Sequence, residues 1–126
     1  MDTPVSGTPR VLLRLEGLAV LVGAVLAYRA IGASWTLFAL LLLLPDLSLA
    51  GYLAGPRAGA VVYNAVHTYI GPSVLAAVAY FGAAPRAWPI CLIWFAHIGM
   101  DRVAGFGLKF PTAFKDTHLS AADTAP

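Results

Sequence analysis

The chain has 126 residues, of which 60% are hydrophobic and 11% are charged, and its mean hydropathy is +0.79. A soluble domain of this length cannot bury so much apolar surface, so we expect the excess to face lipid. The net charge of +2 is too small and too dispersed for a nucleic-acid-binding surface, which excludes that class of partner. The single cysteine, Cys91, excludes an intramolecular disulfide and a cysteine-based metal site. The composition predicts one integral membrane domain whose partner is the lipid bilayer.

Four apolar stretches are long enough to cross a bilayer, which takes about 20 helical residues. They cover residues 11–29, 34–54, 58–82 and 87–106, within a single domain of residues 1–119. The segments between them are RAIGAS (29–34), AGPRAG (54–59) and GAAPRAW (82–88), and each has Gly or Pro and one Arg to end a helix at the headgroups. Connections this short make consecutive helices antiparallel neighbours. The sequence therefore predicts an all-α integral membrane fold, a compact antiparallel bundle of four transmembrane helices.

Two sequence features predict how these helices pack and bend. Ala19, Gly23 and Ala27 recur every fourth residue in the first stretch, which predicts a face of small residues for close helix contact. The adjacent residues Gly71 and Pro72 predict a kink near the middle of the third helix.

Lys and Arg are distributed unequally between the two ends of the predicted helices. Six belong to the N-terminus, the second turn and the C-terminal flank: Arg10, Arg14, Arg57, Arg102, Lys109 and Lys115. The first and third turns contain only Arg29 and Arg86. The positive-inside rule then places both termini in the cytoplasm. The predicted location is an inner (cytoplasmic) membrane, with several crossings.

The ionisable residues inside the predicted helices fall in one layer. Counting at about 1.5 Å per residue from the cytoplasmic ends places them in the cytoplasmic half of the bundle. The layer comprises Glu16, Asp46, Tyr63, Asn64, His67, His97, Asp101 and Arg102. A charge facing lipid at such a depth costs about 2.5–3.5 kcal/mol, so we expect these side chains to face one another.

The layer contains residues that could hold a metal ion. His97 and Asp101 are four residues apart on one helix face, where a carboxylate can orient an imidazole and raise its basicity. The candidate ligands, which offer the nitrogen and oxygen atoms that zinc or another divalent ion prefers, are Asp46, His67, His97, Asp101 and His118. A zinc ion with three protein ligands and a water molecule would suit hydrolysis of a lipid or another amphiphile.

Other interpretations of the layer stay open. His67 and His97 lie at similar depth and could ligate a haem iron axially, although Asp101 makes haem the less favoured cofactor. Carboxylate and histidine groups also move protons or ions in carriers, for which a homodimer would provide room. A hydrogen-bond network that only holds the helices together is the structural alternative. The residues do not decide whether the protein is an enzyme or which small-molecule or lipid ligand it binds.

The C-terminal region is more polar than the rest of the chain. Gly105 predicts the end of the fourth helix. Phe110 and Phe114 are four residues apart, which predicts a short amphipathic segment on the inner membrane surface. Residues 120–126 are predicted to be a disordered tail. His118 either stays in solvent or folds back over the polar layer.

Two stretches, LLPDLSLAGYLAGPRAGAVVYNAVHTY (43–69) and IWFAHIGMDRVAGFGLKFPTAFKDTHL (93–119), resemble a bacterial family of integral membrane proteins catalogued as domain of unknown function 4260. The resemblance extends from about Leu12 to Leu119. It rests on the Pro-Asp and Gly-Pro-Arg of the first stretch, its closing His-Thr-Tyr, and the His-Ile-Gly-Met-Asp-Arg and Thr-His-Leu of the second. It implies a membrane fold and supplies neither a reaction nor catalytic residues.

Overall fold

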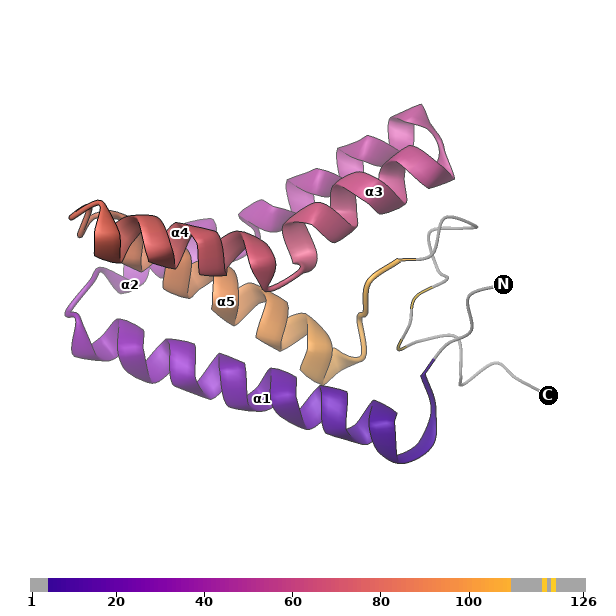
Figure 1. Ribbon diagram of the computed structural model, residues 1–126, viewed down its shortest axis with the longest axis horizontal. Coiled ribbons are helices and arrows are strands. Elements are labelled where there is room, and N and C mark those ends of the chain that lie inside the picture. The colour runs from indigo at the N-terminus through magenta and orange to yellow at the C-terminus, as the bar shows by residue number, and fades with distance from the viewer. Residues whose placement is uncertain (1–4, 110–116, 118, 120–126) are drawn as a thin grey trace.

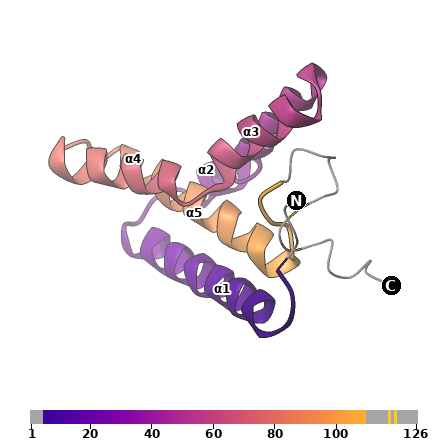
Figure 2. The ribbon, with the colours of Figure 1, turned by 45° about the vertical axis from the view of Figure 1, so that its right-hand side comes forward.

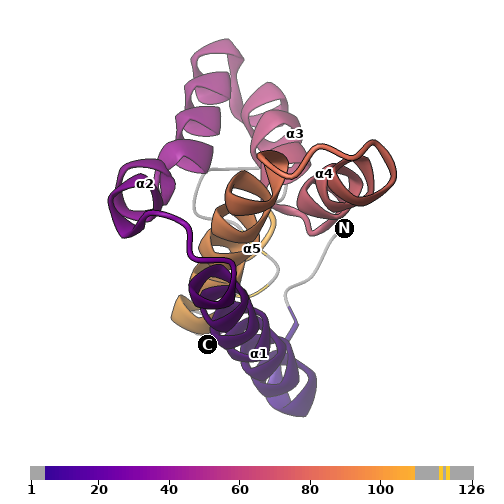
Figure 3. The same cartoon turned by 90° about the vertical axis from the view of Figure 1, so that its left-hand side faces the viewer.

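The computed structural model describes residues 5–109, 117 and 119, and every element within them is helical. The elements are α1 (Gly7–Ala30), α2 (Trp35–Leu41), the 3₁₀ helix η1 (Leu44–Ala54), α3 (Pro56–His67), α4 (Ile70–Phe81) and α5 (Ala87–Ala104). The chain passes back and forth four times, with α2 and η1 forming the second pass and α3 and α4 the third (Figure 1). Figure 3 shows α5 in the centre, with α1, α2 and α4 around it. The prediction of an all-α fold is confirmed.

The outer surface of these helices is apolar. Within the described part of the chain, three helical stretches are long and apolar enough to cross a membrane, judged by length and composition: Gly7–Ala30, Trp35–Ala54 and Pro56–Phe81. Leu53 and Phe81 on their outer faces are 93% and 83% exposed. These stretches support the prediction of a membrane protein. The fourth predicted span corresponds to α5, which has 18 residues and more buried residues than any other helix, and its crossing stays a prediction.

The second pass is broken at Pro45. Proline has no N–H, and its ring clashes with the carbonyl group four residues earlier, which here belongs to Leu41. Accordingly α2 ends at Leu41, and η1 begins at Leu44 with the proline in its first turn. A 3₁₀ stretch of 11 residues is unusually long, and such stretches within a helix often mark a hinge or a functional position. The predicted helical stretch over residues 34–54 is therefore present as two consecutive helices, α2 and η1.

The third pass is broken by Pro72 for the same reason. Its ring excludes the helical position of the carbonyl group of Thr68, whose backbone is extended with φ −94° and ψ 154°. As a result α3 ends at His67 and α4 begins at Ile70. The predicted stretch over residues 58–82 is helical apart from this interruption, and the kink expected at Gly71 and Pro72 is a complete break one helical turn upstream of the proline.

The first and last helices pack against each other along much of their length (Figures 1 and 2). Gly17 of α1 and Gly99 of α5 lie at the contact. A Cβ added to Gly17 would lie 2.3 Å from the Cβ of Arg102, and one added to Gly99 would lie 2.7 Å from the carbonyl oxygen of Gly17. Only glycine at both positions permits this separation of the two backbones.

The buried face of α1 is not the predicted one. Its buried residues are Gly17, Ala24 and Tyr28. Ala19 and Gly23 are exposed, and a Cβ added to Gly23 would meet no described atom within 4 Å. The predicted contact face of Ala19, Gly23 and Ala27 is wrong, because the small size of a residue does not reveal whether it faces a helix or lipid.

The start of α1 and the end of α5 lie at the same end of the molecule. Arg14 donates from Nε and Nη2 to the carbonyl oxygen of Val103, at 3.0 and 2.8 Å. Arg10 Nε donates to the carbonyl oxygen of Leu119 at 2.6 Å. The two arginines therefore fix the beginning of the first helix against the end of the last helix and the segment that follows it.

Gly105 ends α5, as predicted. Its φ of +89° is readily adopted only by glycine, and its N–H donates to the carbonyl oxygen of Arg102 at 3.1 Å. The N–H of Phe106 donates to the carbonyl oxygen of Asp101 at 2.7 Å, which completes a Schellman motif.

Part of the region after α5 is described. Lys109 and Thr117 form an antiparallel bridge, and Leu119 is fully buried. The predicted surface segment around Phe110, His118 and the predicted disordered tail of residues 120–126 lie outside the described residues.

Replacing Gly17 by Ala is expected to weaken the contact between α1 and α5, because the added methyl group would overlap the Cβ of Arg102. Overpacking of this kind costs about 1–3 kcal/mol. We expect a lower midpoint of unfolding in mixed micelles of increasing SDS content, followed by circular dichroism. Gly23→Ala is the matched control, since it adds the same methyl group to the same helix where no described atom lies within 4 Å. Equal losses of stability in both variants would contradict the proposed role of this contact.

Candidate metal centre

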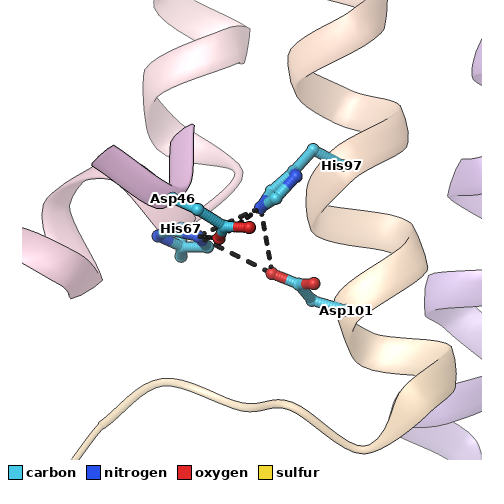
Figure 4. A group of neighbouring side chains, drawn as sticks. All are labelled: Asp46, His67, His97 and Asp101. Atoms are coloured by element: carbon cyan, nitrogen blue, oxygen red, sulfur yellow. Dashed lines mark hydrogen bonds and ion pairs between the residues drawn. The ribbon is translucent and has the colours of Figure 1, made fainter. Parts of the chain in front are cut away.

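Four ionisable side chains from three segments converge on one point (Figure 4). Asp46 comes from the first turn of η1, His67 is the last residue of α3, and His97 and Asp101 are one turn apart on α5. One ligand atom of each lies within 4.8 Å of those of the other three. The structure thus brings together four of the five residues predicted as metal ligands, while the fifth, His118, is outside the described residues.

The distances within this group, called the His/Asp cluster below, are short. The Nε2 atoms of His67 and His97 are 3.1 Å apart. Asp46 Oδ1 lies 3.4 and 3.2 Å from these two nitrogen atoms, respectively. Asp101 Oδ2 lies 3.6 and 3.1 Å from them. The histidine side chains are almost fully buried, whereas the Asp46 side chain is 41% exposed, so the cluster is closed at the histidines and open at Asp46.

Each imidazole ring is oriented by a hydrogen bond from its other nitrogen. His67 Nδ1–H donates to the carbonyl oxygen of Tyr63 at 2.9 Å, and His97 Nδ1–H donates to that of Leu42 at 2.6 Å. A carbonyl oxygen only accepts, so the proton of each neutral ring must be on Nδ1. Both Nε2 atoms then present a lone pair to the cluster, which is the arrangement found in histidines that bind metals.

Four lone pairs consequently face one small space, and these four side chains place no donor between them. Ionised carboxylates accept hydrogen bonds and cannot donate them, and the two neutral imidazoles offer only acceptors on this side. Asp101 Oδ2 is buried and has no hydrogen-bond partner among the residues that the structure describes. Buried acceptors that face one another are costly unless a cation lies between them. One proton can join two of these atoms, whereas a metal ion can join all four.

The carbonyl group that orients His97 is available because of Pro45. In an uninterrupted α-helix the carbonyl oxygen of Leu42 would accept from the N–H of Asp46. After the proline, that N–H donates to Leu43 instead, at 3.1 Å, and the carbonyl group of Leu42 can accept from His97. The break in the second pass therefore places a carboxylate in the cluster and also fixes an imidazole there.

The broken end of α3 is supported by α5. Trp94 Nε1 donates to the carbonyl oxygen of Val66 at 2.7 Å. Arg102 Nη2 donates to that of His67 at 3.0 Å, and its Nη1 donates to that of Phe106 at 3.2 Å. The last carbonyl groups of a helix have no partner within the helix, and in apolar surroundings the protein itself must supply one. Arg102 therefore supports the backbone beside the cluster and is not one of the four converging groups.

The remaining members of the predicted polar layer occupy different places. Tyr63 stacks on the ring of His67, with ring centres 3.7 Å apart. The side-chain amide of Asn64 donates to the carbonyl oxygen of Lys109 at 2.8 Å and accepts from its N–H at 2.6 Å. Burial lowers the pKa of the Lys109 ammonium group, and the negative charge of Asp101 opposes this shift. These contacts tie the segment after α5 to α3, beside the cluster.

Glu16, which was predicted in the same layer, is not one of the four converging side chains. Its side chain is exposed on α1 and does not belong to the His/Asp cluster. Depth was estimated from the number of residues along the helix, and that number does not determine the face from which a side chain leaves.

A cavity of about 500 Å³ lies beside the cluster and was not predicted from the sequence. Its lining comes from α2, η1, α3 and α5 and is apolar except for Ser48 and the indole of Trp94. Pro45 and Val66, which also line it, directly precede Asp46 and His67. In the sequence, the apolar residues that line the cavity have the same pattern as apolar residues that face lipid, so the sequence does not distinguish the two groups.

Comparison with known proteins yields a family and no reaction. The sequence model of a family described as Domain of unknown function (DUF4260) matches residues 10–122. This range contains the entire His/Asp cluster. No curated protein and no solved structure matches the chain. The resemblance seen in the sequence is thus confirmed, and any chemical role must be argued from the cluster itself.

Replacing Arg102 by Met is expected to destabilise the fold, because it removes both donors from the carbonyl groups of His67 and Phe106 while keeping most of the aliphatic chain. A buried carbonyl group without a donor costs about 1–3 kcal/mol. We expect a lower unfolding midpoint in the SDS titration. Arg86→Met is the matched control, since Arg86 is exposed at the start of α5 and the same substitution there should leave the midpoint unchanged. An unchanged midpoint in Arg102→Met would show that these carbonyl groups do not depend on the guanidinium.

Proposed function

The chain belongs to the DUF4260 family, and we propose that it is a membrane-embedded, metal-dependent hydrolase whose ion is held by the His/Asp cluster. The main support for this proposal is that four lone pairs converge on one point. Two come from imidazole rings whose tautomer is fixed by a hydrogen bond at Nδ1, and two come from carboxylates. Imidazole and carboxylate ligands suit zinc and other divalent first-row metals.

The separations between the ligand atoms fit a four-coordinate ion. For metal–ligand bonds of about 2.0–2.1 Å, the ligand atoms at the corners of a tetrahedron lie about 3.3 Å apart. The five separations that involve a histidine nitrogen range from 3.1 to 3.6 Å. The sixth, between the two carboxylate oxygens, is at most 4.8 Å. Axial ligation of a haem is disfavoured, because a distance of 3.1 Å between the two Nε2 atoms leaves no room for a porphyrin plane between them.

The opening at Asp46 favours a catalytic ion over a structural one. Structural zinc sites are closed, whereas catalytic sites combine three protein ligands with a position for water or substrate. Here His67, His97 and Asp101 are the buried groups, and Asp46 is the exposed one. A bound ion would polarise the scissile carbonyl or phosphoryl group and activate water. We propose that Asp46 gives up its position on the ion to the attacking water and accepts its proton.

The broken helices favour a second candidate function, an ion carrier. In many carriers the ion or substrate binds where membrane helices are interrupted. Asp46 begins η1 and His67 ends α3, so the ligands of the second and third passes both lie at such interruptions. In a carrier the ion is cargo and leaves readily, whereas the ion of a hydrolase stays bound.

We expect the protein, purified in detergent without added metal or chelator, to contain about one equivalent of zinc or another divalent metal by elemental analysis. His97→Gln and Asp101→Asn each remove one ligand at nearly constant size and should lower the metal content at least tenfold. Glu16→Gln is the control, since it neutralises a carboxylate outside the cluster and should keep the metal.

Three outcomes separate the alternatives. A metal that survives dialysis in metal-free buffer supports the hydrolase, and one that is lost within minutes supports the carrier. Unchanged metal content in both cluster variants would contradict a metal site at this position. Absence of metal, together with loss of folded protein in both variants, would identify the cluster as a structural hydrogen-bond network.

The orientation that we propose has four crossings of the bacterial cytoplasmic membrane, with both termini in the cytoplasm. It is supported by the six-to-two distribution of Lys and Arg and by the contact of Arg14 with the end of α5. Reporter fusions at Ser34 and Pro85 should give a periplasmic signal, and fusions at Pro56 and Pro126 a cytoplasmic one. A cytoplasmic signal at Ser34 would reverse the orientation, and a periplasmic signal at Pro126 would show that α5 does not cross.

A further inference from the structure

We propose that the cavity beside Asp46 binds the acyl chain of a single-chain amphiphile, whose polar head group lies at the His/Asp cluster. This inference rests on the proposed function, because a metal ion in the cluster would hold the head group. It names the class of substrate on which the proposed hydrolase acts.

The size and lining of the cavity suit an alkyl chain. Its volume of about 500 Å³ lies within the range of about 300–1,000 Å³ that is typical of small-molecule sites. Leu41, Leu44 and Ile93 are among the apolar side chains that form its wall. The helical stretches Trp35–Ala54 and Pro56–Phe81, which contribute most of this wall, are apolar enough to lie in a membrane. An occupant that reaches the cavity from lipid must itself be largely apolar.

The cavity and the cluster share the same three segments. On η1 the lining residue Pro45 precedes Asp46, and on α3 Val66 precedes His67. On α5 the lining residue Trp94 is one turn before His97 and also donates to the carbonyl oxygen of Val66. None of the four cluster residues lines the cavity, but a molecule in it would lie against the backbone that carries Asp46 and His67, so a polar head group at one end could reach Asp46, the exposed member of the cluster.

Ser48 restricts the chemistry of the occupant. Ser48 lines the cavity, and its Oγ atom is buried by the protein and has no hydrogen-bond partner among the residues that the structure describes. A buried hydroxyl group without a partner is costly. Rotation of the side chain about χ1 would turn Oγ toward the cavity, where the carbonyl group of an ester or amide could accept from it and a plain hydrocarbon chain could not. Ser48 therefore favours an acylated amphiphile over other apolar occupants, and it follows Asp46 by only two residues.

The inference can be tested with two chelators that share one head group. The protein is reconstituted in lipid nanodiscs, loaded with Co²⁺ alone, and titrated with acetohydroxamate or octanohydroxamate while the visible spectrum of the metal is recorded. We expect octanohydroxamate to bind at least tenfold more tightly than acetohydroxamate, because only the longer ligand can fill the cavity.

Variants that fill the cavity separate this effect from partitioning of the longer ligand into lipid. Val66→Phe and Ile90→Phe each enlarge a lining residue and should reduce the preference for the longer ligand below threefold, with acetohydroxamate affinity unchanged. Val61→Phe is the matched control, since it makes the same change to an exposed residue of α3 outside the lining and should keep the preference. Using two variants from different helices guards against a folding defect in one.

The possible results also distinguish this inference from the proposed function. Equal affinity for the two hydroxamates in the parent protein would overturn the inference and leave the metal centre intact. The same conclusion would follow if the preference were unchanged in both cavity variants. Failure of the parent protein to bind Co²⁺ would overturn the metal centre, and the acyl-chain site would fall with it.

Discussion

A proline inside an apolar helix leaves a backbone carbonyl group without its donor, and in apolar surroundings only the protein can supply another. Pro45 and Pro72 impose this constraint on the second and third passes of the chain. The breaks also displace the neighbouring N–H groups, so the carbonyl group of Leu42 accepts from His97 and that of His67, at the end of α3, accepts from Arg102. The geometry of the cluster thus begins with two interruptions of the backbone. The side chains that compensate for these interruptions also build the site.

The polar residues of α5 are explained by the same constraint. Side chains of α5 donate to carbonyl oxygens of neighbouring segments: Cys91 donates to Pro72, Trp94 to Val66, His97 to Leu42 and Arg102 to His67. They recur about once per helical turn, so they share the side of α5 that faces the broken passes. An imidazole, an indole and a guanidinium would be costly on a helix facing lipid, and here each has a specific acceptor. The central helix is polar because its neighbours are interrupted.

The sequence predicted the four converging residues better than their surroundings. Asp46, His67, His97 and Asp101 could be assigned to one depth, since the rise per residue in a helix is nearly constant. Depth alone does not fix the direction of a side chain, and Glu16, assigned to the same depth, is exposed on α1. The prolines were visible, but the steric effect of a proline falls on the preceding turn, so the breaks lie upstream of the predicted kink. The contact of Gly17 with Gly99 and the cavity both depend on which helices become neighbours, and residue spacing within one helix does not contain that information.

The close contact at Gly17 joins α1 and α5 backbone to backbone, whereas η1 and α3 form a hairpin that extends away from this pair (Figure 2). The hairpin contributes one carboxylate and one imidazole to the cluster, and α5 contributes the other two. The cluster therefore lies at the interface between the α1–α5 pair and the η1–α3 hairpin, and each of these parts contributes half of its side chains. A cation at this interface would cross-link the two parts, so the affinity of the cluster for the ion would be coupled to the angle of the hairpin relative to α5. A motion that opened the hairpin would then release a bound ion, and a bound ion would in turn resist the opening.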